Sequence, residues 1–113
     1  MDSERLEEFH EVLATIMGRS PHEWVYLPSD EAWSLQSKSA TLMSEEVPPD
    51  QEDAPDAGVP QLAKSNGLIQ TVDVATLQDI VSNARMQRPL ATPDDLFRAF
   101  RFYFERDAFI ELG

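Results

Sequence analysis

Hydrophobic residues near the start of the chain recur every three or four positions, which is the spacing of an amphipathic helix. The residues with this spacing are Leu6, Phe9, Leu13, Ile16 and Met17. They predict a helix over residues 3–17, and Gly18 is placed to end it. Glutamates recur at the same spacing on the opposite face and predict one acidic stripe, formed by Glu4, Glu7, Glu8 and Glu11.

The pattern then changes to one typical of β-strands. Residues 23–27 (EWVYL) are rich in aromatic and β-branched side chains and predict a strand. Residues 32–43 predict a second strand, in which Trp33 begins an alternation of apolar and polar positions. Because only a short turn separates the two segments, we expect an antiparallel pair with Trp24 or Tyr26 close to Trp33 or Leu35.

Helical and strand patterns return after residue 60. Residues 60–65 predict one helical turn, and residues 68–72 predict a third strand. Two longer helices are predicted over residues 74–87 and 93–106, each with apolar positions at helical spacing. The order of these elements predicts an α+β fold, with a small antiparallel sheet of about three strands packed against about three helices.

The helix predicted over residues 93–106 has strong start signals and an unusual number of aromatic residues. Thr92 and Asp95 have the spacing of an acidic capping box. The aromatic residues are too numerous for one stripe: Phe97, Phe100, Phe102, Tyr103 and Phe104. Phe102 therefore covers the sheet or the preceding helix, or it joins Arg98 as an exposed interface anchor.

Residues 44–60 (SEEVPPDQEDAPDAGVP) interrupt these patterns with six carboxylates, four prolines and no positive charge. The prolines oppose both a helix interior and a strand ladder. A segment of this length without regular structure is uncommon in a compact domain, and it is usually functional or disordered. We therefore predict one domain over residues 1–113 with a mobile acidic loop at 44–60.

Charge is distributed very unevenly along the chain. Residues 1–63 contain fourteen acids and three bases, a net charge of −11, whereas residues 64–113 contain seven acids and six bases, a net charge of −1. Such a field repels nucleic acid and anionic membranes and attracts a basic partner. No apolar run approaches the roughly 18 residues that span a bilayer, and the acidic start differs from a signal peptide. We therefore expect a cytoplasmic protein.

The chain offers little for catalysis or for cofactor binding. It has no cysteine, which excludes thiolate zinc sites, and its only histidines are His10 and His22. The motifs HExxH, GxSxG, GxGxxG and GxxxxGK[ST] are all absent from the sequence. A general acid needs a partly buried carboxyl with a raised pKa, and the acidic loop has few apolar residues to supply a pocket. We predict a protein that is not an enzyme, without cofactor or metal; a carboxylate-based hydrolase is the remaining enzymatic alternative.

Four segments together resemble a known family. They are WVYLP (24–28), Trp33-Ser34-Leu35, LQDIVSNA (77–84) and FYFERDAFI (102–110). Their order is similar to that in CdiI-type immunity proteins of bacterial contact-dependent growth inhibition and in related small bacterial domains. The resemblance covers about three quarters of the chain and omits the acidic loop. It implies a cytosolic protein that binds the toxin domain delivered by a neighbouring cell and blocks its active site.

The charge and the resemblance lead to one functional hypothesis: the chain is an immunity protein that neutralises a basic toxin domain. We expect the toxin to be a nuclease, and the complex to contain one toxin domain and one monomer of this chain. The acids predicted to contact that toxin are Glu45, Glu46, Asp50, Glu52, Asp53, Glu7, Glu8 and Glu11. The alternative is a non-catalytic adaptor domain that binds its partner through the aromatic C-terminal helix, with the acidic loop as a solvated insertion.

Overall fold

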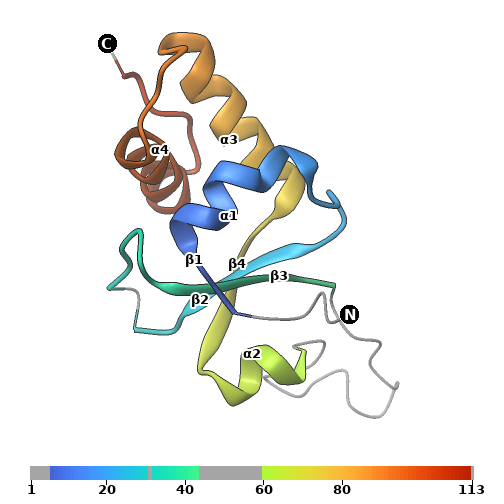
Figure 1. Ribbon diagram of the computed structural model, residues 1–113. Helices are drawn as coiled ribbons and strands as arrows, with labels where there is room; N and C mark the ends of the chain where they lie inside the picture. The colour runs from blue at the N-terminus through green and yellow to red at the C-terminus, as the bar shows by residue number, and fades with distance from the viewer. Residues whose placement is uncertain (1–5, 31, 44–59, 113) are drawn as a thin grey trace.

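The computed structural model describes residues 6–30, 32–43 and 60–112, which form an α+β arrangement (Figure 1). The described strands are β1 (Glu7–Glu8), β2 (Trp24–Pro28), β3 (Lys38–Leu42) and β4 (Leu68–Asp73). The described helices are α1 (Phe9–Thr15), the 3-10 helix η1 (Ile16–Gly18), α2 (Gln61–Ser65), α3 (Val74–Gln87) and α4 (Pro93–Arg106). The predicted α+β class is therefore confirmed.

The described strands form one antiparallel sheet in the order β1-β3-β2-β4. Tyr26 of β2 lies opposite Ala40 of β3 on one side and opposite Gln70 of β4 on the other. The predicted antiparallel pair and the strand after residue 67 are both confirmed. Within the described ranges the sheet has four strands instead of about three, because β1 adds a short edge strand beside β3.

The start of the chain corrects the helix predicted over residues 3–17. Residues 3–5 lie outside the described part of the chain. Glu7 and Glu8 are extended and pair with β3, so the helix begins only at Phe9. The predicted stripe on one helical face therefore does not form, because Glu7 and Glu8 belong to a strand and point to opposite sides of it.

The spacing of Leu6 and Phe9 is that of a helix, but their side chains pack on opposite faces of the sheet. Leu6 packs with the cluster beneath α2, whereas Phe9 is fully buried in the main core. The N–H groups of Phe9 and His10 donate to carbonyl oxygens in the β2–β3 connection at 2.9 Å each. Long-range pairing thus overrides the local helical pattern in this segment.

The second strand is also shorter than predicted, because β3 begins at Lys38 instead of near residue 32. Trp24 lies opposite Leu42 and Tyr26 opposite Ala40, so neither Trp33 nor Leu35 is a cross-strand neighbour of β2. Trp33 instead lies in the connection, and its indole N–H donates to the carbonyl of Pro28 at 2.7 Å. That bond satisfies the only polar group of a largely buried side chain.

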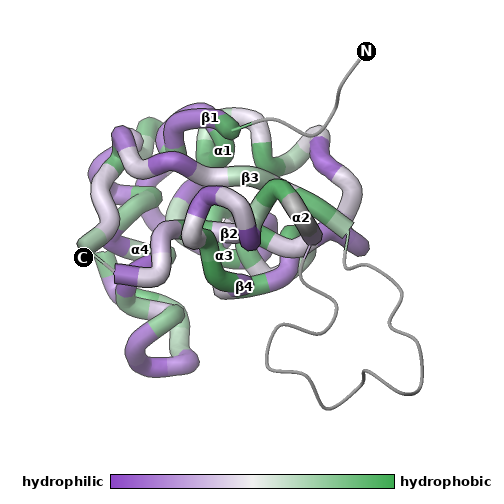
Figure 2. The backbone as a smooth tube through the Cα atoms, turned by 90° about the horizontal axis from the view of Figure 1, so that it is seen from below, coloured by the Kyte–Doolittle hydropathy of each residue, from purple (hydrophilic) through white to green (hydrophobic). Residues whose placement is uncertain are grey.

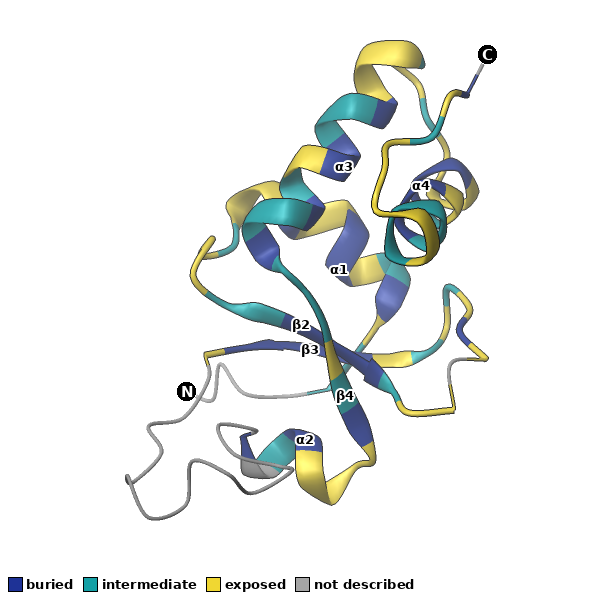
Figure 3. Cartoon of the chain, turned by 180° about the vertical axis from the view of Figure 1, so that it is seen from behind, coloured by how far each residue is buried: buried dark blue, intermediate teal, exposed yellow. Residues whose placement is uncertain are grey.

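Alternate residues of β2 serve two separate cores. Val25 and Leu27 face the main core, which α1, α3 and α4 cover on one side of the sheet (Figures 1 and 3). On the other face α2 lies across the sheet, as Figure 2 shows from below. The buried residues of this smaller cluster are Tyr26, Ala40, Leu42, Ala63 and Leu68. The strand is apolar on both faces because both are covered.

The helices α3 and α4 have the bounds that local signals predicted. Thr92 and Asp95 form the expected capping box: the Asp95 N–H donates to the Thr92 hydroxyl at 3.2 Å, and the Thr92 N–H donates to the Asp95 carboxylate at 3.0 Å. At the other end, Asp107 takes the left-handed conformation (φ 55°), and its N–H donates to the carbonyl of Tyr103.

A chain of aromatic rings connects the start of α1 with the length of α4. The Phe9 ring lies 5.0 Å from that of Phe100, measured between centroids, and 6.0 Å from that of Phe97. Trp33 continues the chain, with centroid distances of 5.7 Å to Phe100 and 5.0 Å to Phe104. Most of these pairs meet edge to face or tilted, as aromatic quadrupoles favour.

Candidate functional site

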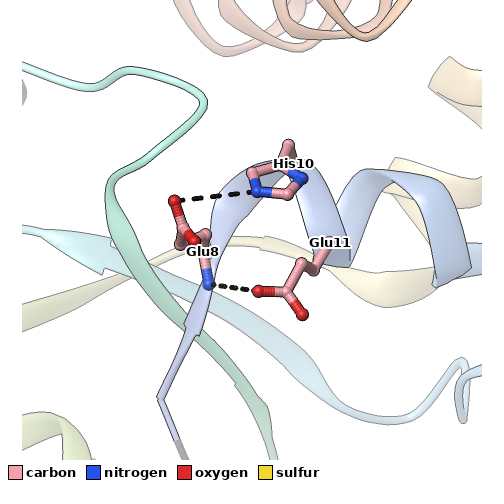
Figure 4. Close-up of side chains that lie close together, drawn as sticks. All are labelled: Glu8, His10 and Glu11. Atoms are coloured by element: carbon pink, nitrogen blue, oxygen red, sulfur yellow. Dashed lines mark hydrogen bonds and ion pairs between the residues drawn. The ribbon is translucent and has the colours of Figure 1, made fainter.

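An imidazole and two carboxylates converge where β1 passes into α1. The His10 Nε2 atom lies 3.7 Å from a Glu8 carboxylate oxygen, and the Glu8 N–H donates to Glu11 Oε1 at 3.4 Å (Figure 4). One donor atom from each of the three residues falls within 4.8 Å of the others. We call these residues, Glu8, His10 and Glu11, the acidic corner.

The acidic corner presents its charge to solvent. The side chains of Glu8 and His10 are 51% and 41% exposed, and Glu11 is exposed as well. A carboxyl group that acts as a general acid usually lies in a partly buried pocket, whereas Glu8 and Glu11 are both exposed. Imidazole and carboxylate groups also bind zinc, which requires ligands in a fixed tetrahedral arrangement that further hydrogen bonds orient. The geometry is better suited to attracting a cationic surface.

Glu7, another of the predicted contact residues, forms an ion pair within the fold. Its two carboxylate oxygens accept hydrogen bonds from both terminal nitrogens of Arg19, at 2.7 and 2.8 Å. The side chains of Glu7 and Arg19 are only 12% and 18% exposed. The hydrogen bond that Arg19 donates to the Glu7 carboxylate is the largest cause of the raised pKa of Arg19, so the guanidinium stays charged. Glu7 therefore holds an internal ion pair, and its contact with a partner stays a prediction.

Arg19 also reaches two threonines, which makes this ion pair a structural junction. Its guanidinium donates to the Thr41 hydroxyl on β3 at 3.0 Å and to the Thr15 hydroxyl at the end of α1 at 2.8 Å. The junction ties β1, β3 and the end of α1 together. Strand alternation explains why Glu7 turns inward here while Glu8 turns out to the acidic corner.

The acidic loop was the other half of the predicted contact surface. Glu45, Glu46, Asp50, Glu52 and Asp53 all lie outside the described residues, as does nearly all of the loop predicted at 44–60. Their contact role stays a prediction. The described chain resumes at Pro60, which is buried and precedes α2.

A second candidate surface lies on the outer face of α4. It is an open groove of about 250 Å³ lined by Phe97, Arg98, Arg101, Phe102, Glu105 and Ile110, which we call the α4 groove. The sequence suggested Arg98 and Phe102 as possible interface anchors, but it gave no sign that Ile110 completes the groove. Phe102 lines this groove, which favours the alternative of an interface anchor over the one in which it covers the sheet or α3.

Arg101 and Arg98 differ in how firmly the fold holds them. The Arg101 Nε–H donates to Glu105 at 2.8 Å, and its guanidinium carbon lies 5.0 Å from the Trp33 ring centroid. Arg98 is 59% exposed, and the ion pair it makes in the described chain is with Asp95 at 3.7 Å. Arg101 is therefore a fixed wall of the groove, while Arg98 reaches into solvent.

The C-terminal segment that brings Ile110 to the groove is anchored at the end of α3. The side-chain amide of Gln87 donates to the Ile110 carbonyl at 2.8 Å and accepts from the Leu112 N–H at 2.7 Å. Arg88 donates to the Leu112 carbonyl at 2.6 Å and to Asp95 at 3.2 Å. Arg88 thus joins the C-terminal segment to the start of α4.

Asp95 is the best-connected carboxylate among the described residues of this half. Hydrogen bonding from the Thr92 backbone is the largest cause that lowers the pKa of Asp95; the Thr92 hydroxyl bond and the charges of Arg88 and Arg98 lower it further. These contacts stabilise the charged form. Asp95 is therefore ionised at neutral pH and structural in role.

The geometry defines a small α+β domain with two candidate contact surfaces. Residues 6–112 match the family described as a domain of unknown function (DUF7716), and the chain belongs to that family. Neither the curated proteins nor the solved structures contain a significant match to this chain. Among the described residues, no helix combines the length and apolarity required to cross a membrane.

Proposed function

We propose that this protein is an immunity-type inhibitor, which binds a basic toxin domain of the nuclease class and blocks its substrate cleft. The observation that carries the proposal is the charge distribution: −11 of the net −12 resides in residues 1–63. A cleft that binds phosphates is cationic, so an acidic protein can occupy it by mimicking the charge of the substrate.

The acidic corner places two of the described carboxylates of residues 1–63 at a defined position. Glu8 and Glu11 are exposed, while Glu7 is neutralised by Arg19 and contributes no net field. Exposed like charges at an interface mainly accelerate encounter, and electrostatic steering raises association rates by about 10- to 1,000-fold at low salt. We assign the corner to steering and initial contact with the toxin.

The proposal requires no chemistry from this chain. Inhibition by occupancy needs a stable surface and complementary charge, and the junction of Arg19 with Glu7 fixes the backbone that carries the corner. The resemblance of the WVYLP and LQDIVSNA segments to CdiI-type immunity proteins supports the same class of function.

A genetic and kinetic experiment tests the proposal. The C-terminal domain encoded by the gene immediately upstream is expressed alone and together with this protein, and cell growth is measured. We expect growth arrest by the domain alone and rescue by co-expression. If that domain is harmless without this protein, the proposal fails.

Stopped-flow binding of the two purified proteins then tests the corner. The Glu8→Gln/Glu11→Gln variant should associate about threefold more slowly at low salt, with the difference shrinking as salt screens the charges. The matched control, Asp79→Asn/Glu111→Gln, removes two exposed charges from α3 and from the C-terminal segment. An equal slowing of both variants would show that only total charge matters and would remove the corner from the contact surface.

A further inference from the structure

The α4 groove is built differently from any surface that a basic toxin would need. Its floor comes from Phe97, Phe102 and Ile110, and its rim carries two guanidinium groups and one carboxylate. The rim therefore has a local net charge of +1 in a chain whose total is −12. The two guanidinium groups of the rim favour a carboxylate as their direct contact, so we expect an occupant of the groove that differs from a basic toxin surface.

The size and openness of the groove indicate what can fill it. Sites for small molecules are usually cavities of about 300–1,000 Å³ that enclose most of the ligand. The groove holds about 250 Å³ and is open to solvent, which suits one or two apolar side chains of another polypeptide. Aromatic and arginine residues are also the usual anchors of protein interfaces.

The charge of the rim specifies the second feature of the occupant. The Asp95 carboxylate that Arg98 approaches at 3.7 Å already accepts bonds from the Thr92 N–H at 3.0 Å and from Arg88 at 3.2 Å. A guanidinium has five N–H donors, so Arg98 retains donors for a further carboxylate. The Arg98 side chain is 59% exposed and can turn toward it.

The rest of the groove is already ordered before any partner arrives. On the rim, Arg101 is held between Glu105 and the Trp33 ring. In the floor, the ring of Phe102 is contacted by Arg106, which lies outside the groove lining and whose guanidinium carbon is 5.6 Å from the ring centroid. Gln87 fixes Ile110 through its carbonyl at 2.8 Å. Because these side chains are ordered before binding, the complex loses less conformational entropy when it forms.

We propose that the α4 groove binds a segment of a partner protein that combines an apolar side chain with a nearby carboxylate. The apolar side chain lies on Phe97, Phe102 and Ile110, and the carboxylate pairs with Arg98. The groove is a second binding surface, separate in residues and in charge preference from the acidic corner.

A displayed library of random peptides tests this inference with the intact protein as bait. We expect enriched peptides that contain an aromatic or long aliphatic residue close to Asp or Glu. The strongest peptide is then synthesised with a fluorophore, and its affinity is measured by anisotropy. A library that yields only basic peptides, or none that binds in solution, overturns the proposal.

Variants locate the binding site of that peptide. Arg98→Gln should weaken binding about tenfold, and replacing the peptide carboxylate by its amide should cause the same loss in the wild type and little further loss in the variant. The control Arg85→Gln removes an exposed arginine of α3 outside the groove and should leave the affinity unchanged. Phe102→Ser should also weaken binding, with circular dichroism confirming that each variant is folded.

Two further outcomes separate this inference from its rivals. Glu8→Gln/Glu11→Gln should leave peptide affinity unchanged, because the acidic corner belongs to the other surface; an equal loss would contradict a separate site. Sedimentation of the protein alone tests a second copy as the occupant. Dimerisation that Arg98→Gln abolishes would assign the groove to self-association and overturn the proposal.

Discussion

The acidic corner and the α4 groove are two candidate contact surfaces that differ in charge and in apolar content. The corner is almost pure charge, with two exposed carboxylates and an imidazole gathered at a strand-to-helix junction. The groove is an apolar floor with a cationic rim, built from a long helix and an anchored C-terminal segment. The first favours rapid encounter with a basic surface, and the second favours retention of an apolar side chain.

Neighbouring residues of one type have different roles in both regions. Glu7 and Glu8 are adjacent, yet Glu7 holds an internal ion pair with Arg19 while Glu8 is exposed. Arg98 and Arg101 are three positions apart, yet Arg101 is fixed by Glu105 and Trp33 while Arg98 extends into solvent. Charge alone therefore does not identify a binding residue, because the partners that the fold supplies decide which charges remain for an external ligand.

The largest expected effect comes from the aromatic chain that supports both regions. Phe100 is fully buried and contacts Phe9, which begins the helix of the corner, and Phe104 of the groove helix. Phe100→Ala should lower the free energy of unfolding by about 3–5 kcal/mol, measured by urea denaturation. The control Phe109→Ala alters a half-exposed ring and should cost far less. An equal loss of unfolding free energy in both variants would show that the ring contacts of Phe100 do not link α1 to α4.

A smaller effect distinguishes the two adjacent glutamates. Glu7→Gln leaves the largely buried Arg19 without its counter-charge and should lower the free energy of unfolding by about 2 kcal/mol. Glu8→Gln should change it by less than about 0.5 kcal/mol, because Glu8 is exposed. Both values come from chemical denaturation. Similar values for the two variants would contradict the assignment of Glu7 to structure and Glu8 to contact.

The start of the groove helix depends on its cap. Thr92→Ala removes the hydroxyl that accepts from the Asp95 N–H and should cost about 1 kcal/mol of stability in a thermal or urea melt. Thr92→Ser retains a hydroxyl and should preserve most of that stability. If the serine variant is as unstable as the alanine variant, the loss comes from packing and not from the cap.

The smallest expected effect is a pH dependence of the stability that Asp95 supplies at the same cap. The pKa of Asp95 is lowered in the folded protein, so it binds a proton less readily there than in the unfolded chain. The stability it supplies is present above about pH 4, the usual range of an unfolded aspartate, and is lost as the pH falls through the lower folded pKa. Stability measured between about pH 4 and 2 should therefore fall less steeply in Asp95→Asn than in the wild type. An unchanged slope would contradict this role.

Local signals were sufficient for the second half of the chain. The bounds of α3 and α4 match those expected from helical periodicity, from the Thr92 and Asp95 box, and from Pro93. These signals lie within a few residues of the structure they specify. The α+β class follows from the same reasoning, because strand and helix patterns are read from short windows.

Non-local contacts account for what the sequence did not predict. The edge strand β1 forms because Lys38 and Ser39 lie beside it, and no pattern near Glu7 announces that pairing. Trp33 fits an alternating strand pattern, but its position is set by Pro28 and by the rings of α4. The sequence likewise indicated only the α4 residues of the groove, because Ile110 reaches the groove through contacts of the C-terminal segment with α3.

Local sequence patterns specify the α+β class and the two long helices with the α4 cap, and the composition places the negative charge in residues 1–63. Which charges face outward depends on tertiary contacts, since Glu7 meets Arg19 across twelve residues and Arg101 meets Trp33 from another element. The two kinds of interaction differ in their range along the chain. Helix periodicity and capping act within a few residues, whereas ion pairing, ring stacking and edge-strand pairing depend on residues that only folding brings together.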